Sequence, residues 1–134
     1  MTVWIFTHGD GDGVCAGAVA LAANPDAKVF FTHPFGLLGD LNQVREGDTV
    51  IICDIALSEM HLEGLIERFK TIEKTGLLHY FDHHPLPEGF RAEDIPGVTI
   101  HRLDASASEI VYSYFKEKVG VLQSRAAIYG AISD

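Results

Sequence analysis

The chain is poor in cysteine, in basic residues and in long apolar runs. Its 134 residues include two cysteines, and 10 Lys and Arg stand against 19 Asp and Glu, for a formal net charge of −9. The chain therefore lacks the positive surface on which generic nucleic-acid binding depends. No apolar stretch approaches the roughly 20 residues that span a bilayer, and the N-terminus lacks the basic start of a signal peptide. We expect a cytoplasmic protein with no membrane partner.

The scarcity of cysteine excludes a disulfide scaffold and a cysteine-rich zinc site. Cys15 falls in an expected helix and Cys53 in an expected strand, and neither belongs to a pair with the spacing of zinc ligands. A chain in which 47% of the residues are hydrophobic can bury a core without disulfides. We expect two reduced, buried thiols in one compact domain.

Apolar runs alternate with amphipathic segments along the chain. The expected strands lie near residues 2–7, 28–32, 49–54, 77–82 and 98–102. The expected helices lie near residues 13–23, 36–44, 58–74, 107–118 and 122–133. Strand followed by helix, repeated, predicts an α/β fold: a three-layer, doubly wound, mostly parallel sheet with helices on both faces. The longest irregular segment, residues 85–97, is expected to be either a rim of the active site or a plain connecting loop.

Carboxylates and imidazoles follow three of the expected strands. In chain order they are His8, Asp10 and Asp12, then Asp54, then Asp82, His83 and His84. Because the carboxyl ends of parallel strands meet at a common crevice, we expect these groups to converge. Mixed oxygen and nitrogen ligands suit Mn²⁺ or a similar divalent ion, with zinc as an alternative, better than the all-oxygen cage that Ca²⁺ prefers. The sequence therefore predicts one metal centre.

The first acidic pair lies in a turn rich in glycine. Asp10 and Asp12 alternate with Gly9, Gly11 and Gly13. Side chains two residues apart point to the same side of an extended chain, and the glycines let the backbone bend closely around an ion. The alternative is that the two aspartates cap the helix that begins near Gly13.

Asp54 closes a strand of Val, Ile and Cys residues. A carboxylate in such surroundings is costly unless it is neutralised or coordinated. Capping of the following helix is an alternative, but Ser58 is better placed as the N-cap of that helix. We therefore interpret Asp54 as a carboxylate that bridges two metal ions.

The two consecutive histidines are expected to have separate tasks. Neighbouring side chains of an extended backbone point opposite ways, so one of His83 and His84 would lie on the metal and the other on the substrate. At the chain's end, Asp134 follows a helical segment and is either a further carboxylate of the site or part of a frayed terminus.

The remaining polar candidates have simpler interpretations. Ser106 precedes a helix with Glu109 three residues later, a capping-box pattern, so we interpret Ser106 as a helix cap and not as a nucleophile. His33 follows a strand and is a candidate for the periphery of the site. The expected structural histidines are His61, His79 and His101.

Taken together, these motifs show that the chain resembles the DHH phosphoesterases, a family named after the triplet that stands here as Asp82-His83-His84. The four segments that resemble the family's motifs are His8-Gly9-Asp10-Gly11-Asp12-Gly13, Cys53-Asp54, Asp82-His83-His84 and Gly130-Ala131-Ile132-Ser133-Asp134. The resemblance covers essentially the whole chain. It implies that residues 1–134 form the catalytic domain and that a second, smaller substrate-binding domain is absent from this chain.

The resemblance also implies a set of roles for the site residues. It implies two Mn²⁺ ions, replaceable by Mg²⁺ or another divalent metal, with the ligands His8, Asp10, Asp12, Asp54, His83 and Asp134. Asp54 would bridge the ions, and Asp82 would orient His83. The catalytic pair would be Asp82 and His84, with His84 on the scissile phosphate or its leaving group. The implied reaction is hydrolysis of phosphodiester or phosphoanhydride bonds by a water that the two metals activate.

The implied substrates are short nucleotides, oligonucleotides or polyphosphate. The expected partner is thus a phosphorylated small molecule or a short oligonucleotide, and a homodimer is compatible with this reading. The short spacing from His8 to Asp10 favours the nuclease-like branches of the family. The alternative is a metal-dependent domain that binds a phosphate or nucleotide with little turnover. A metal-free Rossmann-like binder is disfavoured because acidic residues in its loop would repel phosphate.

Overall fold

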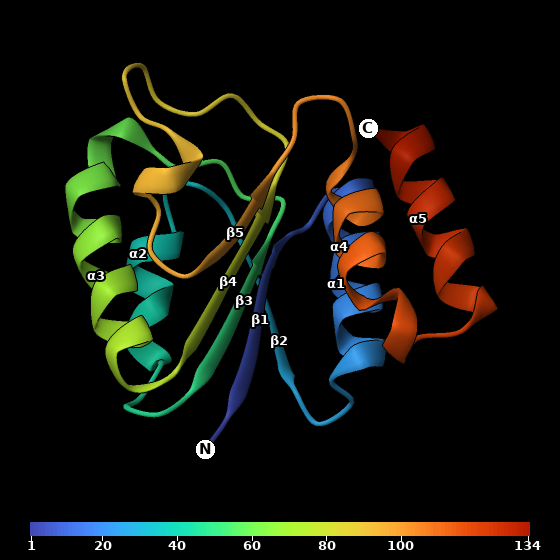
Figure 1. Cartoon of the computed structure of the whole chain (residues 1–134), viewed down its shortest axis with the longest axis horizontal. Helices are drawn as coiled ribbons and strands as arrows, with labels where there is room; N and C mark the ends of the chain where they lie inside the picture. The colour runs from blue at the N-terminus through green and yellow to red at the C-terminus, as the bar shows by residue number, and fades with distance from the viewer.

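The computed structural model describes all 134 residues and places five parallel strands in one sheet between helices (Figure 1). The strands are β1 (Val3–His8), β2 (Lys28–Thr32), β3 (Thr49–Cys53), β4 (Leu77–Asp82) and β5 (Val98–His101). The α-helices are α1 (Gly11–Ala23), α2 (Leu37–Asp40), α3 (Leu62–Thr75), α4 (Ala107–Phe115) and α5 (Val121–Ser133). The predicted α/β class is confirmed.

The strand order, β2-β1-β3-β4-β5, creates a crevice where the chain changes direction across the sheet. After β2 the chain crosses over β1 to reach β3, so the loops that leave β1 and β3 diverge to opposite faces, which is where open α/β sheets hold ligands. The register pairs Thr7 with Cys53, and Cys53 with Phe81. The residues that follow these three, His8, Asp54 and Asp82, therefore lie in one row at the carboxyl edge of the sheet.

Helices cover both faces of the sheet (Figure 1). One core lies between the sheet and α2 and α3, and the other lies between the sheet and α1 and α4. Neighbouring strand residues contribute to opposite cores, as Ile51 and Ile52 do, because side chains alternate along a strand. α5 packs on α1 and α4 and not on the sheet. None of the helices is long and apolar enough to cross a membrane.

The boundaries of several helices differ from the prediction. α1 begins at Gly11 because the side chain of Asp10 caps it. Short 3₁₀ turns extend the helical segments at η1 (Leu41–Gln43), η2 (Glu59–His61) and η4 (Lys116–Lys118). Ser58 stands at the N-cap position of η2, but its side chain makes no capping hydrogen bond. The expected cap at Ser58 is therefore wrong, because the N-cap position of α3 is His61.

The irregular segment 85–97 is anchored to the core on the α3 side of the sheet. Leu86 and Phe90 pack against that core, and Ile95 is buried in it. The segment also contains the 3₁₀ turn η3 (Ala92–Asp94). These apolar contacts fix it as an ordered connection between β4 and β5.

Both cysteines are free thiols. Cys53 is fully buried in β3, and its burial raises the pKa of the thiol. Cys15 is partly buried in α1, and burial, with the nearby Asp12 charge, raises the pKa of this thiol as well. Neither is therefore a reactive thiolate at neutral pH.

Candidate metal centre

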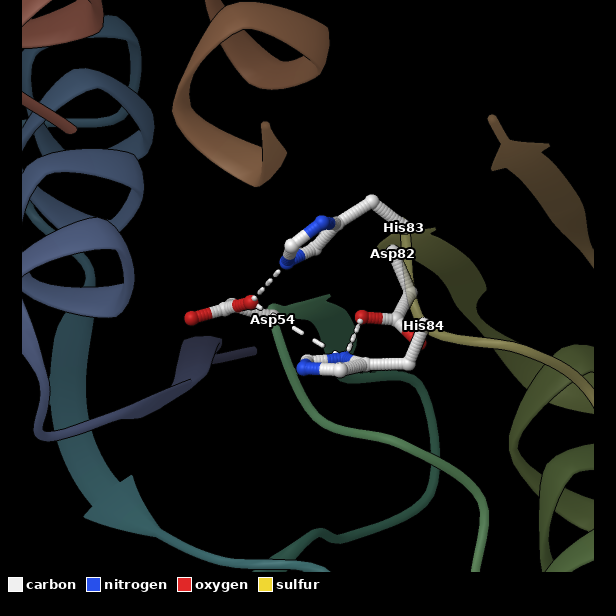
Figure 2. Close-up of side chains that lie close together, drawn as sticks. All are labelled: Asp54, Asp82, His83 and His84. Carbon is white, nitrogen blue, oxygen red and sulfur yellow. Dashed lines mark hydrogen bonds and ion pairs between the residues drawn. The ribbon is translucent and has the colours of Figure 1, made fainter. Parts of the chain in front are cut away.

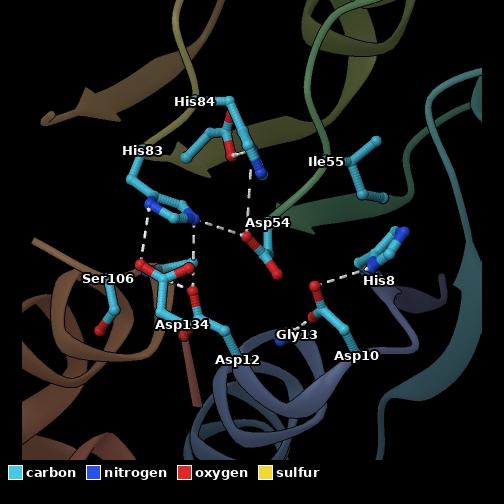
Figure 3. Close-up of polar contacts among 12 residues, drawn as sticks. His8, Asp10, Asp12, Gly13, Asp54, Ile55, His83, His84, Ser106 and Asp134 are labelled. Atoms are coloured by element: carbon cyan, nitrogen blue, oxygen red, sulfur yellow. Dashed lines mark hydrogen bonds and ion pairs between the residues drawn. The ribbon is translucent and has the colours of Figure 1, made fainter. Parts of the chain in front are cut away.

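The carboxylates and imidazoles singled out in the sequence converge at the carboxyl edge of the sheet (Figure 3). Three groups of residues have potential ligand atoms that lie within 4.8 Å of one another: His8, Asp10 and Asp54; Asp12, His83 and Asp134; and Asp54, Asp82, His83 and His84. The residues come from the ends of β1, β3 and β4, the start of α1 and the end of α5. The convergence expected from the strand ends is therefore present.

Asp54 lies at the centre of this cluster (Figure 3). Its Oδ1 is 3.0 Å from Nε2 of His83 and 4.0 Å from Nδ1 of His84. The residue is 2% exposed, and its Oδ2 is buried without a hydrogen-bond partner. Its backbone has a φ of 59°, in the left-handed region that Asp tolerates better than most residues. The structure thus holds a carboxylate with an unsatisfied oxygen at the middle of the site.

The acidic surroundings make ionisation of Asp54 unfavourable. Burial, followed by the neighbouring carboxyl groups of Asp10 and Asp12, raises the pKa of Asp54 to about 9. Crowded carboxylates and an orphaned buried oxygen fit a divalent cation, whose charge favours the ionised form of each of these groups. The residues present therefore suit a metal ion.

Asp12 is held by the start of α4. Its Oδ2 accepts a hydrogen bond from the amide of Ala107 at 3.0 Å, and its Oδ1 accepts one from the amide of Ser108 at 2.9 Å. These amides belong to the first turn of a helix, where a negative charge is favourable. His83 Nε2 lies 3.4 Å from Asp12 Oδ2. The two amides fix the orientation of Asp12 and leave lone pairs directed at the site.

Asp10 combines a capping role with a place in the cluster. Its Oδ1 accepts a hydrogen bond from the amide of Gly13 at 2.8 Å, and its Oδ2 lies 3.2 Å from Nδ1 of His8. Although burial opposes it, the Gly13 hydrogen bond keeps the pKa of Asp10 below its ordinary value. Asp10 therefore caps α1 and also lies in the cluster.

The turn between β1 and α1 is tighter than expected. Gly11 and Asp12 already belong to α1, so the extended alternation expected of Asp10 and Asp12 is wrong. A Cβ on Gly13 would lie 2.0 Å from the carbonyl oxygen of His8. Only glycine permits this close approach, which brings Asp12 back over the end of β1.

Asp134 reaches the site because α5 packs closely on α4. A Cβ on Gly130 would lie 2.1 Å from Ser108 Oγ, so glycine is required for this approach. Asp134 Oδ2 then lies 3.4 Å from Nδ1 of His83. Asp134 therefore stands beside the cluster, as expected of a site carboxylate. A cavity of about 290 Å³ opens beside His83 and Asp134.

The partner of Asp82 differs from the expectation. Asp82 Oδ1 lies 2.7 Å from Nδ1 of His84, and neither a hydrogen bond nor an ion pair joins Asp82 to His83, so the expected orientation of His83 by Asp82 is wrong. The reason is that β4 ends at Asp82 and the chain bends at His84, which brings the His84 ring back to Asp82. This hydrogen bond, followed by the charge of Asp82, raises the pKa of His84 to about 9.

The two histidines do not point in opposite directions. Their ring centroids are 4.4 Å apart, and both rings face Asp54 (Figure 2). The expected divergence is wrong because β4 ends at Asp82, so the backbone at these residues is no longer a regular strand. Their environments still differ, since His83 lies among Asp12, Asp54 and Asp134 whereas His84 is bound to Asp82.

Two supporting residues were not identified from the sequence. The hydroxyl of Tyr80 lies 2.6 Å from the carbonyl oxygen of Ile55 and 3.1 Å from Asp82 Oδ2. Nε2 of His101 lies 2.5 Å from the carbonyl oxygen of His84. Tyr80 could have been found, because it stands two residues before Asp82 on the same strand face.

The remaining polar candidates lie outside the cluster. Ser106 caps α4: its Oγ accepts a hydrogen bond from the Glu109 amide at 3.2 Å, and its own amide donates to Glu109 Oε1 at 3.0 Å. His79 packs against Phe81 and Tyr114. His33 is exposed on the loop that follows β2.

Comparison with solved structures shows the same fold in larger proteins. An uncharacterized protein from Helicobacter pylori G27 matches with a TM-score of 0.63 at 17% identity, over 97% of this chain and 40% of that one. Exonuclease RecJ bound to manganese matches with a TM-score of 0.65 at 14% identity, over 98% of this chain and 38% of that one. RecJ from Thermus thermophilus in complex with Mn²⁺ matches with a TM-score of 0.64 at 15% identity, over 98% of this chain and 21% of that one.

The sequence itself identifies the family. No curated protein matches the chain significantly by sequence. The model of the DHH family, N-terminal domain, matches residues 2–131, a span that contains seven of the eight predicted site residues. The chain therefore belongs to the DHH family, of which it contains the N-terminal domain.

Proposed function

We propose that the chain is the metal-binding domain of a hydrolase that cleaves phosphodiester or phosphoanhydride bonds of short nucleotides, oligonucleotides or polyphosphate. The observation that carries this proposal is the convergence of four carboxylates and two imidazoles, with the buried, unsatisfied Asp54 at their centre. The family and the RecJ neighbours support it. The chain spans 40% or less of the length of those neighbours. Any activity that belongs to a longer protein containing this domain is therefore also a proposal.

The arrangement of the cluster supports a place for each of two divalent ions. In this assignment one ion is held by the group His8, Asp10 and Asp54, and the other by the group Asp12, His83 and Asp134. Asp54 also lies 3.0 Å from His83, so its two oxygens can serve both groups. Mixed carboxylate and imidazole donors favour Mn²⁺, with Mg²⁺ as a substitute. Such ions supply Lewis acidity that polarises the phosphoryl group and makes water a better nucleophile.

The protein's own residues orient the reacting groups. The α4 amides fix Asp12, and the Asp10 cap fixes the start of α1. Asp82 holds one ring nitrogen of His84, which leaves Nε2 free to donate a hydrogen bond to a phosphate oxygen or to the leaving group. In this proposal Asp82 is a positioning residue and His84 is the catalytic residue that touches the substrate.

A second candidate function is binding of a phosphorylated ligand without turnover. It is favoured by one observation: the structural neighbours contain parts with no counterpart in this chain. Groups that position a substrate accelerate its reaction strongly. A domain without them can retain the metals and the ligand and still turn over slowly.

The test is a Mn²⁺-dependent hydrolysis screen against single-stranded DNA, dinucleotides, adenosine bisphosphate, pyrophosphate and polyphosphate. We expect product release with Mn²⁺, none in EDTA, and at least a hundredfold loss in Asp54→Asn. The matched control is Asp26→Asn, which removes an exposed carboxylate from the turn between α1 and β2, at the opposite edge of the sheet. Metal-independent release would contradict the proposal. Binding of an intact nucleotide with Mn²⁺ and no release would favour the second candidate.

A further inference from the structure

The loop that follows β2 leaves the sheet directly beside His8. Thr32, the last residue of β2, is the register partner of His8, and neighbouring strands lie about 4.8 Å apart. Residues 33–36 therefore extend beyond the same edge of the sheet that holds the metal centre. They belong to none of the groups that can bind an ion.

This loop carries an exposed aromatic side chain. Phe35 is 65% exposed, and the other aromatic residues with large exposure are Phe31, Tyr114 and Tyr129. Those three lie within β2, α4 and α5. Phe35 is thus the one strongly exposed aromatic residue on a loop at the carboxyl edge of the sheet. Neither the core nor the proposed chemistry explains its place there.

The loop is held in one conformation. The amides of Gly36 and Leu37 both donate to the carbonyl oxygen of His33, at 2.9 and 3.0 Å. Thr32 Oγ1 donates to Asp40 Oδ2 at 2.5 Å, which ties the end of β2 to α2. A rigid loop can present an aromatic ring to a ligand with little loss of conformational entropy.

We propose that Phe35 stacks on the base of a nucleotide whose phosphate lies at the metal centre, and that this contact makes nucleotides better substrates than base-free phosphoanhydrides. The inference rests on the proposed function, within which it assigns the substrate class. Aromatic rings bind bases of any sequence through their faces. Stacking also needs no positive charge, which suits a chain of net charge −9.

The first test compares two substrates in the full chain with Mn²⁺: a dinucleotide and tripolyphosphate. We expect Phe35→Ala to raise the KM for the dinucleotide at least about fivefold, the lower end of the cost of one lost stack. The KM for tripolyphosphate should stay within twofold. Phe35→Trp should retain the preference for the dinucleotide, whereas Phe35→Leu should lose it. Equal effects on both substrates, or none on the dinucleotide, would overturn the inference.

Phe31→Ala is the matched control. Phe31 is also exposed, at 56%, but it lies within β2, where it lines an apolar groove with Val14, Ala18 and Leu21 of α1. Its removal should change neither KM. If Phe31→Ala raised the KM for the dinucleotide as much as Phe35→Ala does, the increase would not be specific to Phe35, and the inference would be overturned.

A binding measurement separates this inference from the proposed function. If no substrate is turned over, the hydrolase proposal fails, and calorimetry with Mg²⁺ then compares adenosine 5′-monophosphate with inorganic phosphate. We expect Phe35→Ala to raise the Kd for the nucleotide at least about fivefold and to leave the Kd for phosphate unchanged. No preference for the nucleotide in the unmodified chain would overturn the inference.

Discussion

The Tyr80 hydroxyl connects the two sides of the crevice, because it lies 3.1 Å from Asp82 Oδ2 and 2.6 Å from the carbonyl oxygen of Ile55. Tyr80 and Asp82 are fully buried. Ile55 follows the left-handed Asp54, and Asp82 holds His84. A single hydroxyl thus joins the segment that carries Asp54 to the carboxylate that holds the His84 ring.

Tyr80→Phe should weaken both stability and activity. The substitution keeps the ring and leaves two buried oxygens with one partner fewer, so we expect the free energy of unfolding to fall by about 1–3 kcal/mol. Loss of an orienting contact should lower kcat about 10- to 100-fold. Urea denaturation and steady-state kinetics measure the two effects. The control is Tyr114→Phe, whose hydroxyl has no hydrogen bond within the protein; a full kcat in Tyr80→Phe would contradict the positioning role.

Asp54→Asn should stabilise the metal-free protein at alkaline pH. The pKa of Asp54 is raised to about 9 from an ordinary value of 3.8, so the folded state keeps a proton that the unfolded state has released. Its stabilising contribution is present below about pH 4 and is lost as the pH rises to about 9. We therefore expect a pH-dependent loss of stability in the unmodified chain, measured by urea denaturation in EDTA at pH 5 and pH 8, that is smaller in Asp54→Asn.

Asp54→Ala provides the comparison for the backbone at this position. Asn adopts the left-handed conformation nearly as well as Asp, whereas Ala loses about 1–2 kcal/mol there. We expect Asp54→Ala to be less stable than Asp54→Asn under the same conditions. Equal stabilities of the two variants would show that the φ of 59° carries no such cost.

The strands could be predicted closely because the apolar residues of the central strands alternate between the two cores, as Ile51 and Ile52 of β3 do. The helix starts were less predictable, since a start depends on which side chain satisfies the first amides. Asp10 does so for α1, but it was interpreted first as a ligand. At Ser58 the opposite happens, because a residue of the right type stands at the N-cap position and makes no capping bond.

The metal centre could be predicted where it depends on strand ends and could not where it depends on tertiary packing. Register alone aligns the ends of β1, β3 and β4. The amides that hold Asp12 lie 95 and 96 residues away in the sequence, so no local sequence pattern predicts these two hydrogen bonds. The pairing of Asp82 with His84 depends on the bend that follows β4, which alternation along a strand does not predict.

Asp82→Asn should lower the pKa of His84 in the metal-free protein. The hydrogen bond that the His84 ring donates to Asp82, followed by the charge of Asp82, raises that pKa to about 9, and an amide supplies no charge to stabilise the protonated ring. Titration of the His84 ring by NMR in EDTA should therefore move toward the ordinary value of 6.5. Glu88→Gln, an exposed charge change in the following loop, is the control. An unchanged midpoint in Asp82→Asn would show that another group holds the proton.

The stoichiometry of Mn²⁺ binding should distinguish the two groups of ligands that the proposal assigns to the two ions. Calorimetry of the unmodified chain should show two ions. His8→Ala should remove one of them, because it affects only the group with Asp10 and Asp54.

Asp134→Asn should remove the other ion, because Asp134 lies in the group with Asp12 and His83. Asp54→Asn should weaken both, since this residue lies at the junction of the groups. At 100 times Kd each ion adds about 2.7 kcal/mol of stability, so thermal unfolding with and without Mn²⁺ provides a second measurement. A single ion in the unmodified chain, or loss of both ions in His8→Ala, would contradict the assignment of one ion to each group. If the groups bind their ions independently, a substitution in one group removes only the ion of that group.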